Sequence, residues 1–152
     1  MPGVILCGGE SKRMGTDKGL IQLQATTWAQ TAVNKIGVLK IPVVLSVNHT
    51  QFNDYSVVFD PSDLITDEPS LNIGGPLCGL LSVHMRYPCE DLFILACDLP
   101  VMEATIIYQL AESYRQNQNY DAFVFSNRNE PEPLCAIYSS KGLQHTLQLY
   151  QS

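Results

Sequence analysis

The chain has 152 residues, of which 45% are hydrophobic and 16% are charged, and its formal net charge is -6. This length and composition predict one compact domain over residues 1–152, and the acidic balance leaves no broad basic surface to neutralise a nucleic-acid backbone. No apolar run approaches the length of about 20 residues that a membrane-spanning helix needs, so we expect neither nucleic acid nor a membrane as a partner.

Short apolar runs alternate along the chain with segments of helical period. Strands are predicted over residues 3–7, 42–47, 55–59, 91–97, 121–125 and 134–138. Helices are predicted by apolar stripes over residues 28–39, 77–85 and 106–114, and from residue 143 onward. This alternation favours an α/β fold with a mostly parallel sheet that is covered on both faces. Ligands of such sheets bind beyond the carboxyl ends of the strands, so the loops at those ends are the candidate sites.

The first predicted strand runs straight into a glycine-rich loop over residues 7–18, which carries Arg13 and Lys18. Gly8 and Gly9 let backbone N–H groups approach an anion closely, and the two cations supply the positive charge that a polyphosphate needs. The loop matches neither the Walker A pattern nor Gly-x-Gly-x-x-Gly, so a different phosphate-binding scheme is required. The alternative is a surface loop with solvated cations.

A second glycine-rich loop, over residues 72–80, opens a predicted helix with Pro76 in its first turn. The free N–H groups at this helix start, with Gly75 among them, can face a nucleotide or a second substrate. The alternative is a tight turn in which Gly74 or Gly75 has a positive φ. For Gly79, close packing of the helix against the sheet is the preferred explanation.

Asp98 directly follows the buried strand predicted over residues 91–97, at the ligand edge of the sheet. A carboxylate there suits Mg²⁺, which takes one or two protein oxygens and completes its shell with water and substrate phosphates. The alternative is that Asp98 caps the helix that begins near Glu103, or forms an Asx-turn.

The five cysteines and the amino terminus indicate a reducing compartment. No Cys-x-x-Cys pair occurs, and several cysteines lie in apolar runs where a free thiol packs as a small hydrophobe. The apolar start at residues 4–6 is too short for the core of a signal peptide. A cytoplasmic location is therefore predicted.

Taken together and in this order, the motifs resemble those of the molybdenum cofactor guanylyltransferases, within the wider nucleotidyltransferase family of Rossmann-like fold. The segments that carry the resemblance are Leu6-Cys7-Gly8-Gly9-x-Ser11-x-Arg13-Met14-Gly15-x-Asp17-Lys18, Gly75-Pro76-Leu77-x-Gly79-Leu80, Cys97-Asp98-x-Pro100 and Glu132-Pro133-Leu134-Cys135-Ala136-Ile137-Tyr138. Cys7 stands where the family usually has alanine. The resemblance covers nearly the whole chain.

The resemblance implies a three-layer fold of the nucleotide-diphospho-sugar transferase type and a Mg²⁺-dependent reaction. In that reaction GMP passes from GTP to Mo-molybdopterin, and pyrophosphate is released. The implied partners are GTP, Mo-molybdopterin, proteins that deliver molybdopterin, and molybdoenzymes.

The family's GTP-contacting positions fall on Leu6, Cys7, Gly8, Lys18, Asn48, Asp67 and Asp98, and the loop chemistry above adds Gly9 and Gly75. Asp98 is the implied Mg²⁺ ligand, and Arg13, Lys18 and Asp98 are the implied catalytic residues. Asn48 and Asp67 each follow an apolar run at the ligand edge, and either can equally be a turn residue.

Gly8 favours guanine as the base, because related cytidylyltransferases tend to carry alanine there and a missing Cβ leaves more room for a purine. Family members continue beyond the point that matches Ser152 with a basic segment, a strand and a closing helix, so we expect the chain to be incomplete at its C-terminus. Two other functions stay open: a nucleotidyltransferase with a cytidylyl or sugar-phosphate specificity, and a non-catalytic regulatory module that binds a nucleotide.

Overall fold

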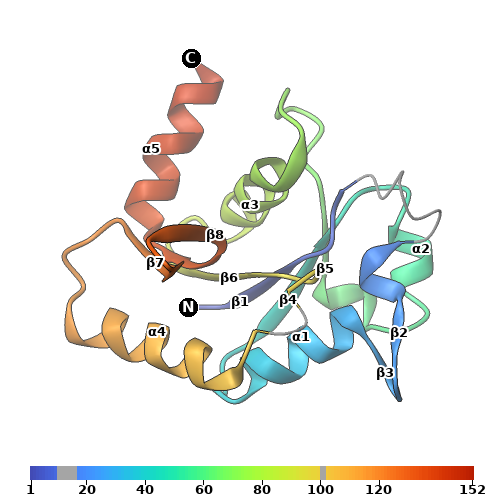
Figure 1. Cartoon of the computed structure of the whole chain (residues 1–152). Coiled ribbons are helices and arrows are strands. Elements are labelled where there is room, and N and C mark those ends of the chain that lie inside the picture. The colour runs from blue at the N-terminus through green and yellow to red at the C-terminus, as the bar shows by residue number, and fades with distance from the viewer. Residues whose placement is uncertain (10–16, 100–101) are drawn as a thin grey trace.

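The computed structural model describes residues 1–9, 17–99 and 102–152 (Figure 1). Within this part of the chain, a six-stranded sheet has the order β5-β4-β1-β6-β8-β7. Its strands are β1 (Gly3–Leu6), β4 (Val43–Val47), β5 (Leu64–Thr66), β6 (Leu92–Ala96), β7 (Ala122–Asn127) and β8 (Glu130–Tyr138). All neighbouring pairs from β5 to β6 are parallel, and β8 alone runs antiparallel to both of its neighbours.

Four helices cover the two faces of this sheet. Figure 1 shows α1 (Trp28–Gly37) and α4 (Ala104–Gln116) on one face, and α3 (Gly75–Arg86) and α5 (Ser140–Gln151) on the other. The residues of β1 alternate accordingly, since Ile5 packs in the core beneath α1 and α4 while Val4 packs in the core beneath α3. Because both faces are buried, β1 is apolar at every position. The predicted α/β fold with a mostly parallel sheet is confirmed.

Short elements complete the described chain. They are the 3-10 helices η1 (Lys18–Leu20) and η2 (Pro61–Asp63), the antiparallel pair β2 (Gln22–Leu23) and β3 (Thr26–Thr27), and the helix α2 (Phe52–Tyr55). None of the helices in the described residues is long and apolar enough to cross a bilayer.

The strand predicted over residues 55–59 is wrong. α2 ends at Tyr55, and a turn follows in which the N–H groups of Val58 and Phe59 both donate to the carbonyl oxygen of Tyr55. Tyr55 and Phe59 stack with ring centroids 6.1 Å apart, whereas Val57 is 86% exposed. The two rings are four residues apart, which is a helical and not a strand spacing, so this apolar run closes its backbone hydrogen bonds locally. The other five predicted strands and all four predicted helices are present.

The parallel pairing brings four strand ends together at one edge of the sheet. β1 ends before Cys7, β4 before Asn48, β5 before Asp67, and β6 before Cys97 and Asp98. Register fixes this alignment, because Leu6 lies opposite Ser46 on one side and Ala96 on the other. The residues that follow these strands therefore converge, as expected for a parallel sheet.

Close packing of α3 on the sheet depends on Gly79, as predicted. A Cβ at Gly79 would stand 2.4 Å from the Ser46 hydroxyl oxygen, which is buried and has no hydrogen-bond partner in the part of the chain that the structure describes. We expect Gly79→Ala to lower the free energy of unfolding by about 1 to 3 kcal/mol, because α3 or Ser46 must move. Urea denaturation measures this loss.

Gly37→Ala is the matched control. No atom of the described chain lies within 4 Å of a Cβ built at Gly37, which ends α1. This variant should keep the parent's stability or gain up to about 1 kcal/mol from helix propensity. Equal stability of the two variants would contradict the close-packing role of Gly79.

Candidate functional site

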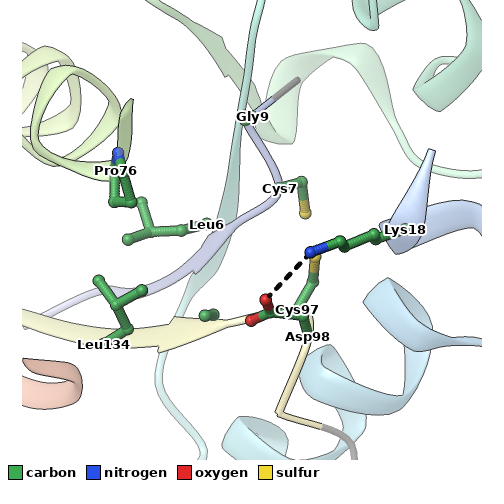
Figure 2. A pocket seen from close by; sticks show the side chains of 10 residues that line it. Leu6, Cys7, Gly9, Lys18, Pro76, Cys97, Asp98 and Leu134 are labelled. Carbon is green, nitrogen blue, oxygen red and sulfur yellow. Dashed lines mark ion pairs between the residues drawn. The ribbon is translucent and has the colours of Figure 1, made fainter. Parts of the chain in front are cut away.

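A pocket of about 190 Å³ lies at the carboxyl ends of β1 and β6. Its lining residues are Leu6, Cys7, Gly8, Gly9, Lys18, Pro76, Ala96, Cys97, Asp98 and Leu134. Figure 2 shows Leu6, Pro76 and Leu134 grouped on one side and the charged side chains on the other. Six of the predicted site residues thus meet in one pocket, which has an apolar wall and a charged wall.

The charged wall is formed by Lys18 and Asp98, which come from segments far apart in the sequence. Lys18 Nζ lies 3.8 Å from Asp98 Oδ2, and the two side chains are 43% and 44% exposed (Figure 2). An ion pair this exposed contributes little to stability, about 0 to 1 kcal/mol, so both charges remain accessible to a ligand. α4 has Glu103 as its N-cap, so the alternative in which Asp98 caps that helix is wrong.

Gly8 follows β1 and faces the ends of β4 and β5. A Cβ built on Gly8 would be 3.8 Å from the Asn48 backbone nitrogen and 3.9 Å from Asp67 Oδ1. Asn48 and Asp67, predicted from their positions after strands, therefore converge on the glycine that begins the loop. Their arrangement extends the site from the pocket across the neighbouring strand ends.

Asp67 has a buried carboxylate oxygen, Oδ1, to which no described residue donates a hydrogen bond. Burial raises the pKa of this carboxyl, and the nearby His49 opposes the rise. A buried acceptor without a donor costs free energy, and a ligand donor placed beside Gly8 would remove that cost.

Asn48 also acts as a turn residue, which was the alternative explanation for it. Its Oδ1 accepts hydrogen bonds from the Gln51 backbone N–H at 2.9 Å and from the Thr50 hydroxyl at 2.7 Å. This side chain therefore shapes the turn that leads from β4 into α2. A role in ligand binding stays a prediction.

The two remaining glycines of the predicted site adopt backbone conformations that side chains disfavour. Gly75 has a φ of 71°, so the positive φ expected in that loop falls on Gly75 and not on Gly74. Gly9 has a φ of 152°. Gly75 precedes Pro76 of the pocket wall, while Arg13 lies outside the described residues.

The pocket thiols are packing groups. Cys7 is buried, and burial, together with the hydrogen bond that its S–H donates to Cys97, raises the pKa of its thiol well above the usual range. A protonated, buried thiol is a poor nucleophile. The pocket therefore favours chemistry that needs no attack by Cys7.

Sequence reasoning missed the polar group beneath Lys18. Asp17 was noted only as part of a motif, yet its carboxylate accepts hydrogen bonds from the Gly19 backbone N–H, the Tyr55 hydroxyl and the Gln51 amide. Tyr55 was assigned to a strand, and Gln51 was not considered. The signal that could have found them is their spacing: Tyr55 follows Gln51 by four residues, so on a helical turn the two side chains lie on the same face.

Comparison with known proteins identifies the family. A family model described as "MobA-like NTP transferase domain" matches residues 3–152. The chain belongs to this family. As a MobA-like domain, it is a nucleotidyltransferase domain, and its pocket lies where the loop motifs of the resemblance meet.

Curated relatives of this MobA-like domain carry related names. The "Molybdenum cofactor biosynthesis bifunctional protein" of Synechocystis sp. is 30% identical over 142 residues, which are 93% of this chain and 40% of that protein. The "Probable molybdenum cofactor guanylyltransferase" of Geobacillus sp. is 26% identical over 152 residues, which are 100% of this chain and 76% of that protein. The chain thus spans less than half of the first relative and about three quarters of the second.

Solved structures share the fold of the MobA-like domain. Molybdopterin-guanine dinucleotide biosynthesis protein A from Archaeoglobus fulgidus superposes with a TM-score of 0.77 at 18% identity, over 99% of this chain and 73% of that one. A CMP:2-keto-3-deoxy-manno-octonic acid synthetase, complexed with CTP, gives a TM-score of 0.74 at 14% identity, over 99% of this chain and 78% of that one. At these identities the likeness concerns the fold alone.

The raised pKa of Asp67 predicts a pH-dependent stability. Between the ordinary aspartate pKa of 3.8 and the higher folded-state value, the folded chain binds more protons than the unfolded chain, so the free energy of unfolding falls as pH rises through this window. We expect Asp67→Asn to be more stable than the parent at pH 7. The difference should vanish near pH 3, about a unit below the ordinary pKa.

Asp60→Asn is the control of opposite sign. Hydrogen bonds from the Ser62 backbone N–H and hydroxyl lower the pKa of the Asp60 carboxyl, so its ionised form stabilises the fold at neutral pH. This variant should be less stable than the parent at pH 7 and equal to it in acid. Thermal melts of all three proteins from pH 3 to pH 8 measure both effects, and a destabilised Asp67→Asn at pH 7 would refute the assignment.

Proposed function

We propose that this MobA-like domain transfers GMP from GTP to Mo-molybdopterin and releases pyrophosphate, in the cytoplasm. The observation that carries the proposal is the meeting of Lys18 and Asp98 beside Gly8 in one pocket at the ends of β1 and β6. A cation there can hold phosphate oxygens, and a carboxylate can hold the divalent cation that accompanies them. The names of the Synechocystis and Geobacillus relatives support the substrates.

The pocket suits a reaction with few catalytic side chains. The attacking group is a phosphate of the acceptor, which is ionised at neutral pH, so no general base is required. It forms a bond to the α-phosphorus of GTP while the bond to the bridging oxygen of pyrophosphate breaks. Positioning and charge neutralisation then determine the rate. We assign the pyrophosphate oxygens to Lys18 and Arg13.

Asp98 is the residue that we propose holds Mg²⁺. In the described residues no three His, Cys, Asp or Glu side chains gather as a metal site, so a cation that needs several protein ligands does not fit. One exposed carboxylate beside a phosphate-binding lysine does fit Mg²⁺, which completes its octahedron with substrate oxygens and water. When bound, Mg²⁺ would neutralise charge on the phosphates. Its affinity for the protein should therefore depend on the nucleotide.

Asp67 and Gly8 support guanine as the base. Guanine presents two adjacent N–H donors on one edge, and the uncompensated Asp67 Oδ1 beside Gly8 is an acceptor for such donors. Cytosine presents one exocyclic amine at the end of an edge whose other two groups, N3 and O2, are acceptors. A carboxylate in this position therefore discriminates between the two bases by donor count.

Pyrophosphate release tests the whole proposal. The wild-type chain is incubated with GTP, Mg²⁺ and Mo-molybdopterin, and in parallel with sugar phosphates and small alcohol phosphates as acceptors. Release with Mo-molybdopterin alone supports the proposal. Release only with another acceptor assigns a different nucleotidyltransferase, and GTP binding without release with any acceptor identifies a nucleotide-binding module.

Asp98→Asn should lower kcat by about 100-fold or more, because charge neutralisation in the transition state is lost. The melting temperature should change little, since the exposed Lys18–Asp98 pair contributes about 0 to 1 kcal/mol. The matched control is Glu112→Gln. Glu112 is also 44% exposed and pairs with Arg115 at 3.3 Å, but it lies on α4 away from the pocket. Near-normal turnover of Asp98→Asn would remove Asp98 from the mechanism.

Gly8→Ala should change nucleotide preference without harming the fold. Among the described residues, its added Cβ meets no atom closer than 3.8 Å, which is ordinary contact. The methyl group occupies the space beside Asp67 that we assign to guanine, so GTP affinity should fall by about tenfold or more while CTP affinity is less affected. Calorimetric titration of parent and variant with GTP, CTP and ATP measures this, and a parent that prefers CTP would overturn the base assignment.

A further inference from the structure

We propose that Gln51 and Tyr55 are positioning residues, which fasten the two ends of the glycine loop and thereby determine where Lys18 stands. The inference rests on the proposed function, since it assigns these residues to the phosphate-binding side of that site. Neither residue lines the pocket itself. Gln51 is the N-cap residue of α2, and Tyr55 is its last residue.

Gln51 joins the start of the loop to its end with one side chain. Its Nε2 donates to the Cys7 carbonyl oxygen at 3.0 Å and also to Asp17 Oδ2. Its Oε1 accepts from the Asn48 backbone N–H at 2.9 Å. Both amide protons and the carbonyl are thus used, and the side chain is only 7% exposed. A buried, fully satisfied amide has one favourable orientation, so it holds three segments in a fixed relation.

Tyr55 supplies a second donor to the same carboxylate. Its ring is fully buried, and its hydroxyl donates to Asp17 Oδ1 at 2.8 Å. Burial, together with the negative groups around it, raises the pKa of the Tyr55 hydroxyl, so it remains a donor at every physiological pH. Hydrogen bonds to a charged acceptor are stronger than bonds between neutral groups.

The lack of a side chain at Gly19 is independent support for the hydrogen bond between Tyr55 and Asp17. A Cβ at Gly19 would stand 1.9 Å from the Tyr55 hydroxyl oxygen, so a larger residue there would push that hydroxyl away from Asp17. The Gly19 N–H itself donates to Asp17 Oδ1 at 2.9 Å, so Asp17 caps the start of η1. The chain on both sides of Lys18 is therefore held by one carboxylate.

The consequence concerns the reach of Lys18. With Asp17 and Gly19 fixed, the lysine stem starts from a defined point, and its Nζ lies in the pocket 3.8 Å from Asp98. A displacement of about 1 Å in a charge-positioning group can cost 100-fold in rate. The Gln51, Tyr55 and Asp17 contacts thus act on phosphate binding through Lys18.

Hydrogen exchange tests the anchoring without any ligand. Tyr55→Phe removes one hydrogen bond and keeps the buried ring. Its matched control is Tyr114→Phe, because Tyr114 donates to Asp91 at 2.6 Å in a part of the fold remote from the pocket. Tyr55→Phe should raise amide exchange of residues 17–20 by about tenfold over the parent, while Tyr114→Phe leaves that segment unchanged. Unchanged protection in Tyr55→Phe overturns the proposal.

A double-mutant cycle tests the route through Lys18. Tyr55→Phe should weaken GTP binding about tenfold in calorimetry, as expected for one lost bond to a charged group. In a Lys18→Ala background, the same substitution should have no further effect beyond about twofold. Independent, additive losses would show a general structural role and overturn the proposal.

Gln51→Glu provides a second test of the same idea. It keeps the size and the acceptor for Asn48, but it replaces the donor to Asp17 with a second carboxylate. Like Tyr55→Phe, it should speed amide hydrogen exchange of residues 17–20 and weaken GTP binding. If both the exchange rate and the GTP affinity equal those of the parent, the proposal is overturned. If the parent binds no GTP, the proposed function falls, and the exchange experiment still decides whether Gln51 and Tyr55 anchor the loop.

Discussion

The parallel pairing of β1 with β4 and β6 is the constraint on which the rest of the structure depends. Parallel neighbours end at the same edge, so the residues after each strand are brought within reach of one another. This is why Gly8, Asn48, Asp67 and Asp98 meet although up to 90 residues separate them in the sequence. The helices on both faces make that edge the open one, because they bury the faces of the central strands.

Charge and polarity at this edge are arranged for a ligand and not for stability. The exposed Lys18 and Asp98 contribute little to folding, and no donor from residues 1–9, 17–99 or 102–152 reaches the buried Asp67 oxygen. The carboxylate of Asp17, by contrast, receives three donors. The site thus combines an Asp17 carboxylate whose hydrogen bonds are satisfied with the groups that we propose bind phosphate, metal and base, and active sites commonly give up stability in this way.

The sequence predicts the site residues that directly follow strands. It does not predict Gln51 and Tyr55, which contact the site from the α2 segment. The period of the apolar runs predicts β1, β4, β6 and the four main helices, and position after a strand points to Asp98, Asn48 and Asp67. Tyr55 was assigned wrongly because an apolar run of five residues has no period that separates a strand from a local turn. Gln51 was missed because its importance lies in three contacts with distant segments, which no local pattern encodes.

The reversal at β8 divides the pocket into two parts of different origin. β8 runs antiparallel to β6, so the pocket wall at Leu134 comes from within a strand, near the register pair of Leu95 and Cys135, and not from a loop after one. The wall on the Lys18 side is made of η1 and of residues that follow β1 and β6, whereas the apolar wall comes from β1, the first turn of α3 and β8. Substitutions at Leu134 can therefore reshape the apolar wall while the wall of Lys18 and Asp98 keeps its geometry. The two walls of the pocket can diverge separately.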